Sequence, residues 1–269
     1  MSTCTLKRVL ITLLLYSIIL SADGKLGIQE HPGEYIPLNV EFKDEYNNTV
    51  TFKQLLDNKP AILTLNYFGC PHICTPQLQD LAKNLEMVNL KENKDYKVIT
   101  LSFNPNETSE DAAHKKKELL SAMRRNFNAD AWSFLTGKEV NIKKITQSVG
   151  FSYEKEENSP NGMVQYTHPA VLVAISPEGK ITRYLNGIKQ LPFDIQMAML
   201  EASKGTVRPT IAKTLLFCFA FDPKNKTYVF AAEKVGAVLM SLILGGFFIY
   251  LLKSGRKQNT AKEESSDES

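Results

Sequence analysis

The chain has 269 residues, of which 43% are hydrophobic and 23% are charged, an ordinary composition for a globular protein. Its net charge of +3, spread without a basic stripe, argues against a nucleic-acid partner, and its four cysteines are too few for a disulfide-stabilised scaffold. We therefore expect one domain of ordinary size with additional segments, or two small domains.

The first predicted element is a signal peptide or an N-terminal anchor over residues 1–22. Lys7 and Arg8 precede the apolar run VLITLLLYSIILSA at 9–22, which is the layout of a secretory signal. Cleavage is expected after Ala22, and an uncleaved anchor stays open as the alternative.

Residues 23–203 have the pattern of a single α/β domain. An extended lead-in at 23–60 has the pattern of a β-hairpin followed by a short helical piece. Strands and helices then alternate, an order that matches the thioredoxin-like fold. The predicted elements are strands at 61–67, 96–103 and 132–137, helices at 75–90, 109–127 and 139–151, a hairpin at 170–187 and a helix at 191–203, with Thr75 and Ser109 as N-caps.

A transmembrane helix is predicted over the uncharged run VGAVLMSLILGGFFIYLL, residues 235–252. At about 1.5 Å per residue this run spans roughly 27 Å, close to the thickness of the hydrocarbon core of a bilayer. Basic residues directly after it favour a cytoplasmic tail at 253–269. The domain would then lie on the periplasmic side of a bacterial inner membrane. Two interpretations of the juxtamembrane segment, 204–234, are left: it is an interfacial segment, or it forms a strand packed on the domain.

Cys70 and Cys74 lie in the stretch CPHIC, between a predicted buried strand and the start of a helix. A helix N-terminus favours thiolate over thiol, and a spacing of four places both sulfurs on one side. A structural disulfide, a redox-active pair and a metal site all fit this pattern. A structural disulfide that closes so short a loop would add little stability. Thiol oxidoreductases of this fold usually have two residues between the cysteines, whereas this chain has three. A zinc site would normally need a second pair of ligands.

His168 directly precedes the predicted strand AVLVAI. In a thioredoxin-like domain the loop before this strand lies beside the cysteine helix, so the topology puts His168 next to Cys70 and Cys74. An ordinary loop histidine is the alternative. Two thiolates and one imidazole would form a soft site with few ligands, which suits Cu(I).

These stretches resemble the Sco/SenC family of copper-binding, thioredoxin-like proteins over roughly residues 35–203. The resemblance rests on CPHIC, WSFLTG at 132–137, VGFSY at 149–153 and His168 before AVLVAISPEGK. It implies that Cys70, Cys74 and His168 bind copper, as Cu(I) and, as a second alternative, also as Cu(II). It also implies copper delivery, or thiol reduction, during assembly of the dinuclear copper centre of cytochrome c oxidase.

The favoured function is a membrane-tethered copper metallochaperone rather than an enzyme, and the implied recipient is cytochrome c oxidase subunit II. Other copper chaperones, thioredoxin-like reductants and membrane lipid are the further expected partners, and nucleic acid is not. The alternative is a thiol–disulfide oxidoreductase that keeps the subunit II cysteines reduced. In that role Cys70 would be the attacking thiolate and Cys74 the resolving one.

The chain departs from the family pattern at several positions. His72 and Asn104 stand where the family often has Asp. Three roles are left for His72: a fourth ligand, a residue that tunes the copper affinity, or an exposed side chain. Asn104 is expected to alter the electrostatics near the site. The clear membrane span lies at the C-terminus, which resembles a bacterial subgroup. Cys218 is expected to be a buried apolar thiol, with a copper or partner contact as the alternative.

Overall fold

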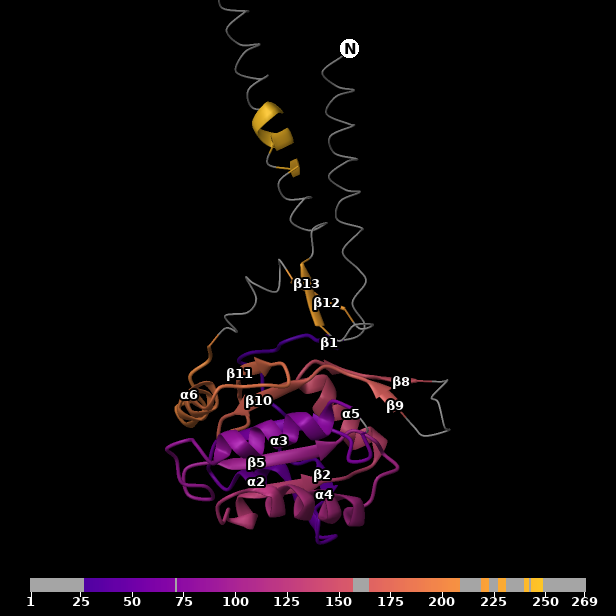
Figure 1. Ribbon diagram of the computed structural model, residues 1–269, viewed down its shortest axis with the longest axis vertical. Coiled ribbons are helices and arrows are strands. Elements are labelled where there is room, and N and C mark those ends of the chain that lie inside the picture. Colours follow the sequence, from indigo (N-terminus) through magenta and orange to yellow (C-terminus); the bar gives the residue numbers. More distant parts are fainter. Residues whose placement is uncertain are drawn as a thin grey trace, which may run out of the picture. The chain divides into compact units, whose positions relative to one another are not determined.

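The computed structural model describes residues 27–70, 72–156, 165–208, 219–222, 227–230, 240–241 and 243–248. The chain divides into two compact units, residues 1–208 and 209–269. The first unit contains the main sheet and its helices (Figure 1). All three candidate ligands belong to this unit.

The first unit is built on a five-stranded sheet with the strand order β11-β10-β4-β5-β6. Its parallel strands are β4 (Ala61–Asn66), β5 (Lys97–Ser102) and β6 (Trp132–Leu135). The hairpin strands β10 (Val171–Ile175) and β11 (Ile181–Asn186) complete the sheet, and β10 runs antiparallel to β4. Every residue of β4 and β10 is buried, as expected for central strands covered on both faces.

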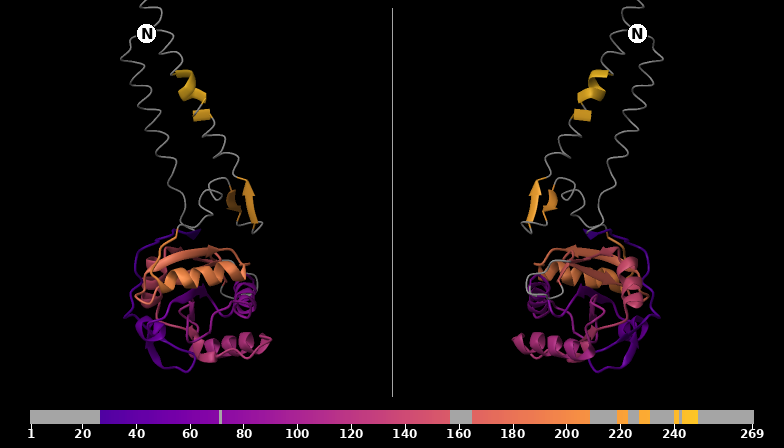
Figure 2. Two further views of the ribbon diagram at one scale, coloured as in Figure 1. Left: turned by 90° about the vertical axis from the view of Figure 1, so that its left-hand side faces the viewer. Right: turned by 90° about the vertical axis from the view of Figure 1, so that its right-hand side faces the viewer.

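Helices cover both faces of this sheet (Figure 2). Side chains of α3 (Cys74–Leu85), α4 (Ser109–Ala122) and α6 (Pro192–Ser203) share one hydrophobic cluster. Side chains of α5 (Glu139–Ser148) belong to a second cluster. Layers of helix, sheet and helix confirm the predicted α/β, thioredoxin-like fold.

The predicted N-terminal hairpin is confirmed. β2 (Glu41–Lys43) pairs with β3 (Thr49–Thr51), and α2 (Phe52–Leu56) follows directly. The rings of Phe42 and Phe52 meet edge to face at 5.7 Å, within the cluster that α5 also joins. The hairpin therefore completes the core on the α5 face of the sheet.

Several short elements were not predicted. β1 (Gly27–Ile28) pairs with β7 (Phe151–Ser152), and β8 (Glu154–Glu156) pairs with β9 (Gln165–Thr167). A short 3-10 helix, η1 (Ala129–Ala131), precedes β6. Strand β9 matters for the site because its last residue, Thr167, directly precedes His168.

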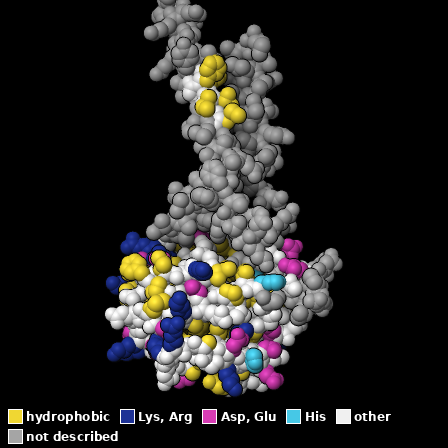
Figure 3. Space-filling model, viewed as in Figure 1, with side chains coloured by type: hydrophobic (Ala, Val, Ile, Leu, Met, Phe, Trp, Pro, Cys, Tyr) yellow, Lys and Arg dark blue, Asp and Glu magenta, His cyan; other side chains and the backbone are white. Residues whose placement is uncertain are grey.

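The face seen in Figure 3 carries basic and acidic side chains together with scattered hydrophobic ones.

The second unit contains an antiparallel hairpin of β12 (Phe219–Asp222) and β13 (Thr227–Phe230). Residues 240–241 and 243–248 are helical. None of the helices in the described residues has the length and hydropathy that spanning a bilayer requires. The predicted signal at 1–22, much of the predicted span at 235–252 and Cys218 lie outside the described residues.

Both predicted N-caps were wrong by one or two positions. α3 begins at Cys74 with Ile73 at the cap position, so Thr75 lies inside the helix. α4 is capped by Thr108 rather than Ser109. The Thr108 side chain accepts the Asp111 N–H while the Asp111 carboxylate accepts the Thr108 N–H. This reciprocal pairing satisfies two backbone donors, which Ser109 in the first helical position could not do.

Replacing the cap tests this assignment. Thr108→Ala should lower the free energy of unfolding by about 1 kcal/mol, because the Asp111 N–H loses the side chain that accepts it. Ser109→Ala should change it by less than about 0.5 kcal/mol, since this side chain lies in the first helical position. Urea unfolding followed by the fluorescence of Trp132, the single and fully buried tryptophan, measures both. Equal losses in the two variants would contradict the capping box.

Candidate metal centre

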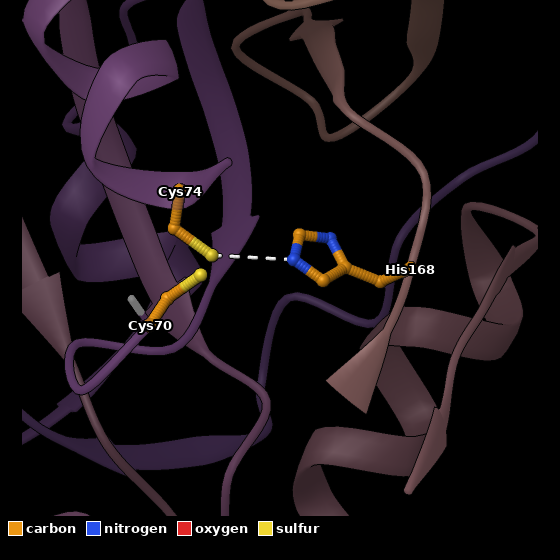
Figure 4. A group of neighbouring side chains, drawn as sticks. All are labelled: Cys70, Cys74 and His168. Atoms are coloured by element: carbon orange, nitrogen blue, oxygen red, sulfur yellow. Dashed lines mark hydrogen bonds between the residues drawn. The ribbon is translucent and has the colours of Figure 1, made fainter. Parts of the chain in front are cut away.

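The thiol arm of the site is the connection between β4 and α3. The Cys70 N–H donates to the carbonyl oxygen of Tyr67 at 3.3 Å, which folds the chain into a tight turn after the strand. Cys74 follows as the first residue of α3, so both thiols lie at the helix N-terminus. Figure 4 shows the two sulfur atoms side by side, both directed toward His168. Both cysteines are free and buried.

The imidazole arm is the connection between β9 and β10, where His168 lies buried. Its Nδ1 lies 3.0 Å from the carbonyl oxygen of Pro169. Because a carbonyl can only accept, this contact favours the neutral tautomer with its hydrogen on Nδ1 and its lone pair on Nε2. Nε2 faces Cys74 Sγ at 3.2 Å (Figure 4). A backbone carbonyl that fixes the tautomer in this way is typical of metal-binding histidines.

The three predicted ligands therefore come together from segments far apart in the sequence. The two sulfurs and the imidazole nitrogen all lie within 4.8 Å of one another, and all three residues are buried. Two soft sulfurs and one nitrogen, with no carboxylate in the group, match the donors that Cu(I) prefers. The residues present thus fit a copper ion.

The two thiols have opposite acid–base character. Hydrogen bonding by the Cys74 thiol is the main cause that lowers the pKa of Cys70 far below its ordinary value, and the His72 N–H, 3.5 Å from Cys70 Sγ, assists. Burial, together with the neighbouring Cys70, raises the pKa of Cys74 well above its ordinary value. Of the two thiols, Cys70 is therefore the one that ionises more readily, an arrangement suited to disulfide exchange or to metal binding.

Aromatic rings surround the imidazole. The ring of His168 lies 5.0 Å from that of Phe103 and 6.0 Å from those of Tyr67 and Phe151, measured between centroids. The Tyr166 ring packs in turn on Tyr67 and Phe103, at 5.2 and 5.4 Å. This cluster restricts the rotation of the imidazole and limits the access of water. Burial, followed by the negative charge of Cys70, raises the pKa of the Tyr67 hydroxyl.

A buried amide pair beside Cys74 was not anticipated from the sequence. Asn66 at the end of β4 donates to Gln77 of α3 at 3.0 Å. A hydrogen bond from Asn66 also partly opposes the rise in the pKa of Cys74. In the described part of the chain, Asn66 Oδ1 and Gln77 Nε2 lack a partner. Two signals could have identified the pair, a polar residue ending an apolar strand and a glutamine one helical turn after Cys74.

The other residues singled out from the sequence have separate positions. His72 is exposed, and among the described residues it is not part of the Cys70–Cys74–His168 group. Asn104 is buried, and its side-chain oxygen accepts the Tyr166 hydroxyl at 3.2 Å.

The sequence matches a described protein family. The family model SCO1/SenC matches residues 33–199, a range that contains all three residues of the group. A curated relative, the SCO1 protein homolog of Bacillus subtilis (strain 168), is 26% identical over 168 residues. That match covers 59% of this chain and 80% of the relative.

Solved structures share the fold. A proposed electron transfer protein of Aquifex aeolicus VF5 has a TM-score of 0.57 at 26% identity, covering 65% of this chain and 95% of that chain. The ScoI protein of Arabidopsis thaliana, solved with copper bound, has a TM-score of 0.52 at 19% identity, covering 65% and 99%. Identity as low as the second value shows a common fold and no more.

Proposed function

The chain belongs to the SCO1/SenC family, and from this premise we propose that it is a copper metallochaperone that assists assembly of the copper centre of cytochrome c oxidase. The observation that carries the proposal is the buried group of Cys70, Cys74 and His168. The proposed ligands are its two sulfurs and the imidazole Nε2. Copper is the cargo of the protein, and subunit II of the oxidase is the proposed recipient.

The chemistry of the group supports transient binding of Cu(I). Thiolate and imidazole are ligands that Cu(I) prefers, and three ligands leave the ion accessible to a donor from a recipient. The lone pair of His168 Nε2 already faces the sulfurs, so binding does not require the imidazole to change its tautomer. The ScoI protein of Arabidopsis thaliana was solved with copper bound, which makes copper the first metal to test here.

Copper binding should release a proton. Cys70 supplies a thiolate, whereas the raised pKa of Cys74 keeps that residue a thiol until a metal displaces its proton. Between the two pKa values, the apparent Cu(I) affinity should therefore rise about tenfold for each pH unit. Competition against a chromophoric Cu(I) ligand, corrected for its own protonation, at two pH values one unit apart measures this. An affinity independent of pH would exclude a protonated Cys74 as the starting state.

The proposal as a whole is tested by metal stoichiometry. Purified full-length protein in detergent is reduced, loaded with Cu(I) without oxygen and freed of unbound metal. About one copper per chain, together with weak retention of Zn²⁺, would support the proposal, because zinc prefers four ligands. Failure to retain copper at micromolar protein concentration would overturn it.

A second candidate function is favoured by the difference between the two thiols. The Cys70 thiolate would attack a disulfide of the partner, form a mixed disulfide and release one partner thiol. Cys74 would lose its proton, attack Cys70 Sγ and release the second partner thiol, leaving a Cys70–Cys74 disulfide. A thioredoxin-like reductant would then restore the pair. Reduction of an oxidised subunit II fragment by protein that retains no copper would favour this role over copper delivery.

The same proposal includes a membrane tether. The supporting observation is the uncharged run at 235–252, followed by basic residues. The domain at 23–203 would lie on the non-cytoplasmic side of the membrane. Alkaline phosphatase fused after residue 208 should then be active, and the same enzyme fused at the C-terminus should be inactive. The opposite pattern, or recovery of intact protein without membranes, would overturn the tether.

A further inference from the structure

The loop between β5 and α4, residues 103–108, contacts both arms of the candidate metal centre. It is fixed at one end by the buried strand β5 and at the other by the Thr108 cap of α4. In the sequence the cysteines and His168 are more than 90 residues apart. A segment that holds both arms can therefore set the distance between them.

Glu107 holds the thiol arm. Its carboxylate accepts the N–H groups of Phe68 and Gly69, each at 2.8 Å, and these residues directly precede Cys70. The hydroxyl of Ser102, the last residue of β5, donates to the same carboxylate. Hydrogen bonds to an ionised carboxylate are short and strong, so this contact fixes the start of the thiol turn to the end of β5.

Asn104 holds the imidazole arm. Its side-chain oxygen accepts the hydroxyl of Tyr166, which stands two residues before His168 on strand β9. The same oxygen accepts the Asn106 N–H at 3.1 Å, so the loop also stabilises its own shape. Because Asn104 is buried, the bond to Tyr166 is shielded from competing water.

We infer that Glu107 and Asn104 are positioning residues, which fix the separation between the thiols of Cys70 and Cys74 and the imidazole of His168. The inference rests on the proposed function for its importance, although the geometry itself does not depend on metal. Loosening the Glu107 contact should free the turn that carries Cys70. Loosening the Asn104 contact should free the strand that leads to His168 and leave the thiol turn in place.

The first test is the reactivity of Cys70 in the metal-free, reduced full-length protein. Glu107→Gln keeps the size of the side chain but replaces one acceptor oxygen by a donor, so one of the two N–H groups loses its partner. The rate of iodoacetamide alkylation of Cys70, read by tandem mass spectrometry, should rise roughly three- to tenfold. Tyr166→Phe should leave this rate unchanged, because it removes only the bond on the imidazole arm.

The second test is Cu(I) affinity. Glu107→Gln and Tyr166→Phe should each lower it roughly three- to tenfold, within the range known for residues that orient metal ligands. Glu110→Gln removes a carboxylate from an exposed position in the first turn of α4, and Tyr153→Phe removes a hydroxyl from a ring that packs on Tyr166. Both controls should behave like the wild type.

Thr51→Ala separates positioning from general stability, since it removes the capping box of α2, outside the 103–108 loop. If Thr51→Ala raised Cys70 alkylation as much as Glu107→Gln does, or if Glu107→Gln had no effect on alkylation, the inference would be overturned. If the wild type bound no copper, the proposed function would fail, while the alkylation rates would still decide the role of Glu107.

Discussion

Replacing both thiols, Cys70→Ser with Cys74→Ser, should abolish stoichiometric binding of Cu(I). The two sulfurs supply two of the three donors in the group, and a serine hydroxyl is a hard, protonated donor that Cu(I) binds poorly. The expected loss exceeds about a thousandfold in affinity, the largest effect predicted for this protein. Copper retained after gel filtration, together with competition against a chromophoric Cu(I) ligand, measures it.

Two comparisons make this result specific. Cys4→Ser with Cys218→Ser removes the same number of thiols outside the group, and this variant should retain about one copper per chain. A marked loss in that control would show that the three proposed ligands are an incomplete set. Retention of copper by the Cys70→Ser/Cys74→Ser protein at wild-type affinity would exclude the thiol pair as the metal site.

The serine variant must also fold for its result to count. Both cysteines are buried and belong to the core cluster on the α5 face of the sheet, so some loss of stability is expected. Cys70→Ala with Cys74→Ala keeps the site apolar and serves as a second form of the same test. Its tryptophan fluorescence should match that of the wild type, while copper binding should still be lost.

Local sequence patterns were enough to predict the thiol arm. An apolar strand, a cysteine pair spaced by four and the start of a helix are all contiguous along the chain. The position of His168 required one further step, the assumed thioredoxin-like topology, in which the loop before β10 lies beside the N-terminus of α3. The structure brings the three residues together because β10 pairs directly with β4.

The sequence did not predict the contacts that hold the two arms. Glu107 follows the end of β5, and the carboxyl ends of the parallel strands β4 and β5 lie at the same edge of the sheet. A carboxylate at that position was therefore a signal that could have been noticed. Its two partners are backbone N–H groups, which no residue type reveals, and the turn that aims them depends on the folded loop.

The incorrect helix boundaries have a similar cause. Helix α4 was predicted to continue to residue 127 but ends at Ala122. Beyond it, the Glu86 carboxylate accepts the N–H groups of Arg124 and Arg125. The side chain of Glu86, the residue that caps the end of α3, thus takes the place of the backbone carbonyls that would accept these two N–H groups in a longer α4. Such a competition between helix and tertiary contact cannot be read from local pattern alone.

His168→Ala should weaken Cu(I) binding at least about tenfold without removing it. Loss of a residue that only orients a metal ligand costs about 10- to 100-fold, so loss of a ligand itself should cost no less. The two sulfurs remain in place and can still hold the ion between them. Competition titration gives the affinity, and X-ray absorption at the copper edge should report the loss of a nitrogen donor.

The matched controls are His114→Ala, in the exposed part of α4, and His72→Ala, in the exposed turn between the cysteines. Both should bind Cu(I) within about twofold of the wild type, since neither imidazole belongs to the group. If His72→Ala lost as much affinity as His168→Ala, the ion would have four ligands rather than three. If only His72→Ala lost affinity, the buried imidazole would not be a ligand. In that case its fixed tautomer and its aromatic surroundings would serve the acid–base chemistry of Cys74, which favours the thiol–disulfide function.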